Sequence, residues 1–186
     1  MSELRTNRIV PRDGLVSGTG VGGGIIQVRS SKFTGTELVS CISAFADSSI
    51  ACSITPTRAD SKILVSVSVS GEGNATNQAR FTHRIKRVIS GGSTDYVAGV
   101  VDGGRIRTLG VTGDNSVDAS TSASSFSINN YMDEPATTST ITYTLQFTYD
   151  GTTGSGTYYV NRNVSDSDSS GVPRYVSWMT LMEVSG

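Results

Sequence analysis

Two segments of the chain alternate apolar and polar side chains with a period of two residues, and no other feature constrains the fold as strongly. In residues 63–70 the odd positions carry Ile or Val, and three of the four even positions carry Ser. In residues 141–149 the odd positions carry Ile, Tyr, Leu, Phe and Tyr, and the even positions carry Thr or Gln. Successive side chains of a strand point to opposite faces of a sheet. Both segments are therefore predicted to be antiparallel strands with one face in a core and one in water.

Shorter stretches of the same kind recur along the chain, separated by Gly, Asp, Asn and Ser clusters such as SGEGNATN, SGGST, TGDNS and YDGTTGSG. These weaker strands are predicted at residues 25–29, 37–45, 50–54, 80–89, 95–101, 105–111, 125–130, 157–162 and 175–184. No stretch keeps apolar residues at helical spacing without interruption, and the helix formers Leu, Glu, Lys and Ala are sparse. The sequence predicts an all-β chain whose residues 25–186 form one antiparallel β-sandwich.

Length and charge narrow the possible functions. A chain of 186 residues is long enough for one domain with its own core. Its formal net charge of -1 creates too weak a field to draw it nonspecifically to nucleic acid or to an anionic membrane. The first residues, MSELRTNRIV, are charged where a signal peptide is apolar, so we expect a chain that is made and kept soluble without export.

The first 24 residues differ in character from the rest, because they hold too few apolar side chains to form a core. Within them, GTGVGGG contains Gly18-x-Gly20-x-x-Gly23, the spacing of a dinucleotide-binding loop. Such a loop lies between a buried strand and a helix, whereas here the β-prone IIQVRS follows. We interpret the glycines as a flexible linker, and no cofactor is predicted.

Upstream of this linker, an extended arm is predicted to attach the domain to a partner. RTNRIVPR suits addition to the edge of a partner's sheet, with Ile9 and Val10 in pockets and Pro11 ending the pairing. A disordered terminus is the alternative. The residues assigned to this anchor are Leu4, Arg5, Asn7, Arg8, Ile9, Val10, Pro11 and Arg12.

The last strand, in YVSWMTLMEV, carries large apolar side chains on both of its faces. A strand that is dry on both faces lies either central in a sheet or against another subunit. We predict the subunit contact, and a central strand inside a monomer is the alternative. The residues assigned to an oligomer interface are Trp178, Met179, Leu181 and Met182.

Candidate metal-binding and catalytic residues are few, and each has a simpler interpretation. The single histidine, His83, is interpreted as a core or interface residue. Asp166 and Asp168 have the spacing of calcium-loop ligands, but Ser177 stands where such a loop supplies its bidentate Glu, so an acidic turn is favoured. Two cysteines and one histidine without close spacing do not make a zinc site. No metal site is predicted.

The remaining candidates are cysteines and a basic run. Cys41 and Cys52 are expected to stay thiols, because a chain without a secretory signal is built in a reducing compartment, and a disulfide between neighbouring strands is the alternative. The strand period places Arg80, Arg84 and Lys86 on one wet face and Arg87 on the other. A solvated face or a rim of salt bridges is favoured over a phosphate-binding stripe.

Taken in order, several motifs resemble those of small structural proteins of marine tailed bacteriophages, the tail-fibre or virion-appendage proteins. The motifs are LRTNRIVPRDG, the glycine-rich spacer, GGIIQV, SITPTRADSKILVSVSVSG, DEPATTSTITYTLQF, YVNRNVSDSD and VSWMTLMEV. The resemblance covers nearly the whole chain and depends on the order of these motifs. It implies a virion-anchoring arm at residues 1–24 and a jelly-roll-like head at residues 25–186, similar to the trimeric tumour-necrosis-factor and complement globular-head sandwiches. It implies no catalytic residues.

On this basis we expect a homotrimeric short tail fibre or surface appendage of a bacteriophage particle, made in the host cytoplasm. Its partners are then copies of itself, other virion proteins bound through the arm, and a host-surface glycan. The alternative is a capsid decoration protein that stabilises the head without binding a receptor. Polar loops with few aromatic rings, apart from Tyr96, Tyr131 and Tyr149 near their edges, favour the alternative slightly.

A carbohydrate-active enzyme is the third class that the sequence allows. Such an enzyme needs two carboxylates that converge across a groove. The available pairs are Asp133 with Glu134 and Asp102 with Asp114, all of which we interpret as turn residues. We therefore expect no enzymatic activity.

Overall fold

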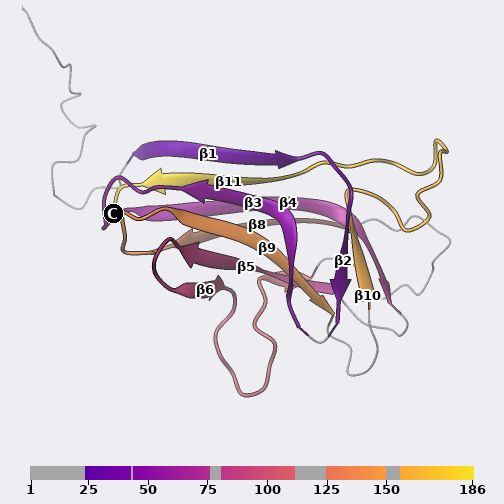
Figure 1. Cartoon of the computed structure of the whole chain (residues 1–186), viewed down its shortest axis with the longest axis horizontal. Coiled ribbons are helices and arrows are strands. Elements are labelled where there is room, and N and C mark those ends of the chain that lie inside the picture. Colours follow the sequence, from indigo (N-terminus) through magenta and orange to yellow (C-terminus); the bar gives the residue numbers. More distant parts are fainter. Residues whose placement is uncertain (1–23, 43, 76–80, 112–124, 150–155) are drawn as a thin grey trace, which may run out of the picture.

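The computed structural model describes residues 24–42, 44–75, 81–111, 125–149 and 156–186, and within them every regular element is a β-strand. The strands form two antiparallel sheets that pack as a β-sandwich (Figure 1). Their bounds are β1 (Ile25–Phe33), β2 (Glu37–Cys41), β3 (Ala46–Ile54), β4 (Lys62–Ala75), β5 (Phe81–Ile89), β6 (Thr94–Val97), β7 (Gly110–Val111), β8 (Ser125–Asp133), β9 (Ile141–Tyr149), β10 (Gly156–Val160) and β11 (Ser177–Val184). The all-β sandwich is confirmed, whereas the jelly-roll topology stays a prediction.

The long strand β4 organises the first sheet, which we call sheet A. Sheet A has the order β1-β11-β4-β10-β2, and β8 pairs with the other edge of β4. β11 and β10 share one edge of β4, because β11 pairs with residues 62–68 and β10 with residues 71–75. The second sheet, sheet B, has the order β3-β9-β5-β6, with the short β7 also beside β5. In sheet A, the first described strand, β1, thus lies directly beside the last one, β11.

The alternating pattern decides which faces form the core. The odd positions of residues 63–69 in β4 are 0% exposed, and those of β9 are at most 3% exposed. Aromatic rings join the two sheets, since Phe147 of β9 stacks on Tyr158 of β10 with ring centroids 4.4 Å apart. Removing these side chains from water is the main force that holds the sheets together. The inner faces predicted for the two clearest strands are confirmed.

Several predicted strand boundaries are wrong; the strands predicted at 25–29 and 50–54, for example, span Ile25–Phe33 and Ala46–Ile54. The strand predicted at 37–45 ends at Cys41, and the strands predicted at 95–101 and 105–111 pair only over Thr94–Val97 and Gly110–Val111. Residues 98–109 form a loop that projects from the sandwich (Figure 1). A turn replaces pairing there, because Gly103 adopts a φ of 57° and Arg105 N donates to Asp102 O at 3.2 Å.

Glycines that suggested a loop after residue 70 belong to a strand instead. β4 continues to Ala75 through the glycines of SGEGNATN. A Cβ at Gly73 would overlap the ring of Phe81, and one at Gly156 would lie 2.5 Å from Phe81 Cζ. These glycines therefore leave room for a buried aromatic ring, which is a packing role that periodicity does not reveal.

Candidate functional site

Several residues assigned from sequence lie outside the described residues. They are the anchor residues Leu4, Arg5, Asn7, Arg8, Ile9, Val10, Pro11 and Arg12, the glycines of the linker up to Gly23, and Arg80 and Asp114. β1 begins at Ile25, where the head domain was predicted to start. The part of the chain that the structure describes contains no helix long and apolar enough to cross a membrane.

The four residues assigned to an oligomer interface divide between the core and the surface. Met179 and Leu181 face inward and are 0% exposed. β11 lies in the middle of sheet A between β1 and β4, which accounts for its apolar inner face. Trp178 and Met182 face outward, where Trp178 is 38% exposed and Met182 is half-buried. Only these two of the four lie where another subunit can contact them.

Met182 belongs to a row of apolar side chains that crosses four strands on the outer face of sheet A. Val28 of β1 lies opposite Met182, Met182 lies opposite Leu64 of β4, and Leu64 lies opposite Met132 of β8. Val28 is 50% exposed and Met132 is 44% exposed. In the next row, Ile25 lies opposite Val184. We call these residues the apolar patch; they are Ile25, Val28, Leu64, Met132, Met182 and Val184.

Trp178 lies beyond the apolar patch on the same face of sheet A. A row of hydroxyl and amide side chains separates the two, namely Ser30, Thr180, Ser66 and Asn130. An exposed apolar row with a polar border and an exposed tryptophan nearby is typical of a protein–protein contact. The outer face of sheet A is therefore the candidate assembly surface.

The outer face of sheet B has the opposite character. Hydroxyl side chains pair across β3 and β9 and at their ends, with Ser53 Oγ 2.8 Å from Thr142 Oγ1 and Thr55 Oγ1 2.8 Å from Thr140 Oγ1. Thr144 of β9 continues this line and lies opposite Lys86 of β5. This face is a polar surface that suits a hydrated ligand.

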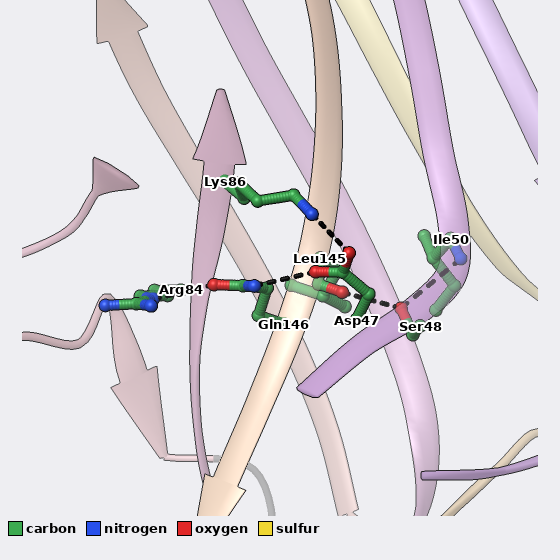
Figure 2. Close-up of polar contacts among 7 residues, drawn as sticks. All are labelled: Asp47, Ser48, Ile50, Arg84, Lys86, Leu145 and Gln146. Atoms are coloured by element: carbon green, nitrogen blue, oxygen red, sulfur yellow. Dashed lines mark hydrogen bonds and ion pairs between the residues drawn. The ribbon is translucent and has the colours of Figure 1, made fainter. Parts of the chain in front are cut away.

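We call this part of the outer face of sheet B the hydroxyl face. At one end of it, Arg84 of β5 is held between two aromatic rings. Its guanidinium carbon Cζ lies 3.7 Å from the ring centroid of Phe45 and 3.7 Å from that of Tyr96. Its Nε donates to Gln146 Oε1 at 2.8 Å, and the Gln146 amide donates to Asp47 Oδ1 at 2.6 Å (Figure 2). These three polar side chains form a line across sheet B, because the strand register places Asp47, Gln146 and Arg84 opposite one another on β3, β9 and β5.

Each carboxylate oxygen of Asp47 accepts a hydrogen bond from a neighbouring side chain. Its Oδ1 accepts from Gln146, and its Oδ2 accepts from Lys86 Nζ (Figure 2). Burial alone would raise the pKa of Asp47, but the hydrogen bonds from Lys86 and Gln146 outweigh it and lower that pKa. Arg84 and Lys86 thus share the outer face of β5, as the strand period predicted, whereas Arg87 points to the interior.

Arg107 is a second cation near Arg84, and the base of the projecting loop holds it. Gly99 N donates to Thr108 O at 2.9 Å, and Arg107 Nε donates to Gly99 O at 2.8 Å. Burial lowers the pKa of Arg84 most strongly, and the positive charge of Arg107 lowers it further. Among the described residues, neither Arg84 nor Arg107 has a carboxylate within ion-pair distance.

The interior holds polar groups that connect the two sheets. His83 of β5 is 0% exposed, and its Nε2 accepts from the Asn129 amide at 2.8 Å. Burial lowers the pKa of His83 to about 4, so the imidazole is neutral at pH 7. Its interpretation as a core residue is confirmed. No nucleophile or carboxylate among its described hydrogen-bond partners makes it a catalytic base.

The carboxylates considered for glycoside hydrolysis are held apart by separate contacts. Asp133 is buried and accepts from Arg87 Nη1 at 2.6 Å and from Tyr143 OH at 2.7 Å. Glu134 points to solvent and pairs with Lys62 at 2.7 Å. Asp102 pairs with Arg105 at 2.6 Å on the projecting loop. The structure brings none of these described carboxylates together across a groove.

The acidic turn near Asp166 is stabilised by arginines. Asp166 adopts a φ of 50°, accepts from Arg162 Nη1 at 3.0 Å and also pairs with Arg174, while Asp168 is exposed.

Cys41 and Cys52 are buried free thiols, and burial raises the pKa of Cys41 to about 12. In the described ranges, no group of three or more His, Cys, Asp or Glu side chains is placed to hold a metal ion.

Sequence reasoning missed the arrangement around Arg84. Phe45 precedes β3, Gln146 lies in β9 and Tyr96 lies in β6, so only the strand order brings them to one arginine. One local signal was present in the sequence. Gln146 is a glutamine where the other polar positions of β9 carry threonine. The apolar patch was missed for the same reason, since its members lie on four strands.

Comparisons with known proteins give little further guidance. No family model and no curated protein matches the chain. Among solved structures, it is similar to a chain described as the structure of infectious bursal disease virus Gx strain, at 12% sequence identity and a TM-score of 0.39. The match covers 94% of this chain and 44% of that chain, so this chain spans less than half of the other's length.

Proposed function

We propose that this chain is a structural protein of a tailed-bacteriophage particle, which associates with copies of itself through the outer face of sheet A. The motif order that resembles virion-appendage proteins supports the class of protein. The apolar patch is the observation that carries self-association, because Val28 and Met132 expose about half of their surface on an ordered sheet face. Burying such side chains against a second copy is favoured by about 25 cal/mol per Å² of apolar surface.

The finer form of the proposal is a homotrimeric appendage. Cyclic assemblies close when the same contact repeats around one axis, and three copies are what the resemblance implies. The arm at residues 1–24 attaches each head to the particle, and the jelly-roll-like head at residues 25–186 is displayed outward. Three heads on one support gain avidity for a host-surface glycan even where each head binds weakly.

A capsid decoration protein is the second candidate, and the projecting loop favours it. Val100 is 86% exposed and Val101 is 74% exposed on this loop, which comprises residues 98–109. Exposed valines on a loop suit a contact with a surrounding protein lattice better than a contact with sugar hydroxyls. In this form the same fold and the same arm stabilise the capsid without binding a receptor.

Incorporation into particles tests the proposed function. The tagged full chain and a variant without residues 1–14 are produced during infection by the phage that encodes the chain, and purified particles are assayed for the tag. We expect the full chain in the particles and the shortened, still folded variant only in the soluble fraction. Imaging of labelled particles then separates tail from capsid. Particles that lack the full chain would refute the virion role, and equal incorporation of both forms would refute the role of the arm.

A further inference from the structure

Arg84 presents hydrogen-bond donors in a fixed orientation. The rings of Phe45 and Tyr96 flank its guanidinium, with each ring centroid 3.7 Å from Cζ. A guanidinium has five N–H donors, of which Gln146 takes the Nε–H. The terminal nitrogens point away from Gln146 and Asp47 (Figure 2). A planar guanidinium held in this way matches two oxygens of a carboxylate or a sulfate.

The charge around Arg84 is also unbalanced. Among the described residues, Asp47 is the carboxylate that contacts this cluster, and its two oxygens accept from Gln146 and Lys86. Arg107 adds a further positive charge near Arg84, and its Nε is engaged with a backbone carbonyl instead of an acid. Lys86 is thus paired with Asp47, whereas Arg84 and Arg107 lie near each other with no carboxylate of the described residues within ion-pair distance. An anion placed here gains favourable Coulomb energy from both arginines.

The surface next to this cluster indicates what carries the anion. Hydroxyl pairs lie on the outer faces of β3 and β9 and just beyond their ends, where Ser53 is hydrogen-bonded to Thr142 and Thr55 to Thr140. Hydroxyl groups both donate and accept, so they suit a polymer that is itself rich in hydroxyls. Among the described residues, this face has no exposed apolar row like the one on sheet A, which a protein partner would use. The chemistry therefore favours a saccharide over a protein.

We propose that Arg84 and Arg107 form a binding site for the oxyanion of an acidic saccharide, which extends from them along the hydroxyl face of sheet B. The oxyanion is the carboxylate of a uronic sugar or the sulfate ester of a sulfated sugar, since both offer paired oxygens to a guanidinium. This inference rests on the proposed function and deepens it, because it names the chemical class of the surface ligand. It also assigns the outer face of sheet B to outward display.

Isothermal titration of the full chain tests the site. The ligands are a galacturonate oligosaccharide, an oligosaccharide of dextran sulfate, neutral dextran and polyglutamate of matched length. We expect one or both acidic saccharides to bind, with affinity that falls as salt is raised, and neutral dextran to give no heat. Failure of both acidic saccharides to bind would overturn the inference. Binding of polyglutamate as tight as that of the saccharides would overturn the assignment to sugar.

Matched variants show whether binding depends on Arg84. Arg84→Gln should weaken binding by tenfold or more, the order of magnitude expected for a lost charge-assisted bidentate contact. Arg84→Lys keeps the charge without the planar guanidinium and should recover only part of the affinity. Arg58→Gln removes an equal charge from an exposed pair with Asp60 and should leave affinity unchanged. Equal losses in Arg84→Gln and Arg58→Gln would show only a net-charge effect and would overturn the site.

Folding and assembly of each variant are checked by thermal unfolding and by mass, so that a folding defect is recognised. Because Arg84→Lys retains the charge, it keeps the test decisive if Arg84→Gln unfolds. A chain that enters particles but binds neither acidic saccharide would refute this inference and leave the proposed function intact. A chain that binds an acidic saccharide but never enters particles would refute the proposed function and leave the saccharide site intact.

Discussion

The Asn129 amide donates to Nε2 of His83 over 2.8 Å and so connects β8, at one edge of sheet A, to β5 in sheet B. The contact is polar, fully buried on the histidine side and located where the two sheets approach each other. The imidazole is neutral at pH 7, because burial lowers the pKa of His83 to about 4. The stability of the sandwich is therefore expected to depend on pH.

The fold should lose stability in mildly acidic solution. In the unfolded chain His83 titrates near its ordinary pKa of about 6.5, whereas in the folded chain its pKa is about 4. As pH falls through this window the unfolded state takes up the proton first, so the free energy of unfolding falls. The expected loss is about 2 kcal/mol at pH 5 and about 3 kcal/mol in full below pH 4. Urea unfolding at pH 7, 6, 5 and 4 measures it.

His83→Gln is the control for this prediction, because the amide does not titrate. Its free energy of unfolding should be lower than that of the unchanged chain at pH 7 and should change less between pH 7 and pH 5. The Asp47 carboxylate acts in a separate window, since its lowered pKa places its loss of stability at still lower pH. Parallel pH profiles for both chains would contradict the role given to His83.

Asp133 should be far more important for stability than its neighbour in sequence. It is the shared acceptor of Arg87 and Tyr143 in the interior, so Asp133→Asn is expected to lower the free energy of unfolding by about 2–4 kcal/mol. Glu134→Gln removes an exposed pair with Lys62 and should cost less than about 1 kcal/mol. Chemical denaturation of both variants compares them. Equal effects would contradict the buried position of Asp133.

Gly73 should not tolerate a methyl group. A Cβ there would overlap the Phe81 ring, so Gly73→Ala is expected to cost about 1–3 kcal/mol through overpacking. Combining it with Phe81→Leu should give a smaller loss than the sum of the two single changes, because the smaller side chain frees the space. Gly104→Ala, which has open space around its Cβ, should lie within about 0.5 kcal/mol of the unchanged chain. Additive losses for Gly73 and Phe81 would contradict the contact.

Local pattern was enough to predict the core but not the surfaces. The alternation in β4 and β9 correctly identified the buried positions, because one dry face forces a period of two. The same pattern correctly placed Arg87 away from Arg84 and Lys86. It wrongly placed Gly73 in a loop, because the residue type alone does not distinguish a strand glycine that makes room for Phe81 from a glycine in a turn.

The candidate sites could not be predicted from local pattern, because they depend on which strands are neighbours. The apolar patch exists only because β1, β11, β4 and β8 lie side by side in a particular register. The stacking of Arg84 between Phe45 and Tyr96 likewise needs β3 and β6 on either side of β9 and β5. The interface assignment to β11 identified Trp178 and Met182 at the surface but included Met179 and Leu181, because two-sided apolarity also marks a central strand.

The central claim is that the chain associates with copies of itself through the apolar patch, and Met132 is the position that tests it. It lies on the edge strand β8 and is 44% exposed, so Met132→Lys places a charge on the patch without entering the core. Thr94→Lys adds the same charge to the exposed start of β6, on the other sheet, as a matched control.

The most direct measurement is the mass in solution of the unchanged chain, Met132→Lys and Thr94→Lys, by sedimentation equilibrium over a range of concentrations. We predict a multiple of the 19.5 kDa chain mass, three in the trimeric form, for the unchanged chain and for Thr94→Lys, and a folded species of 19.5 kDa for Met132→Lys. An unchanged chain that stays at 19.5 kDa at every concentration would contradict the account, as would a Met132→Lys variant that keeps the mass of the assembly.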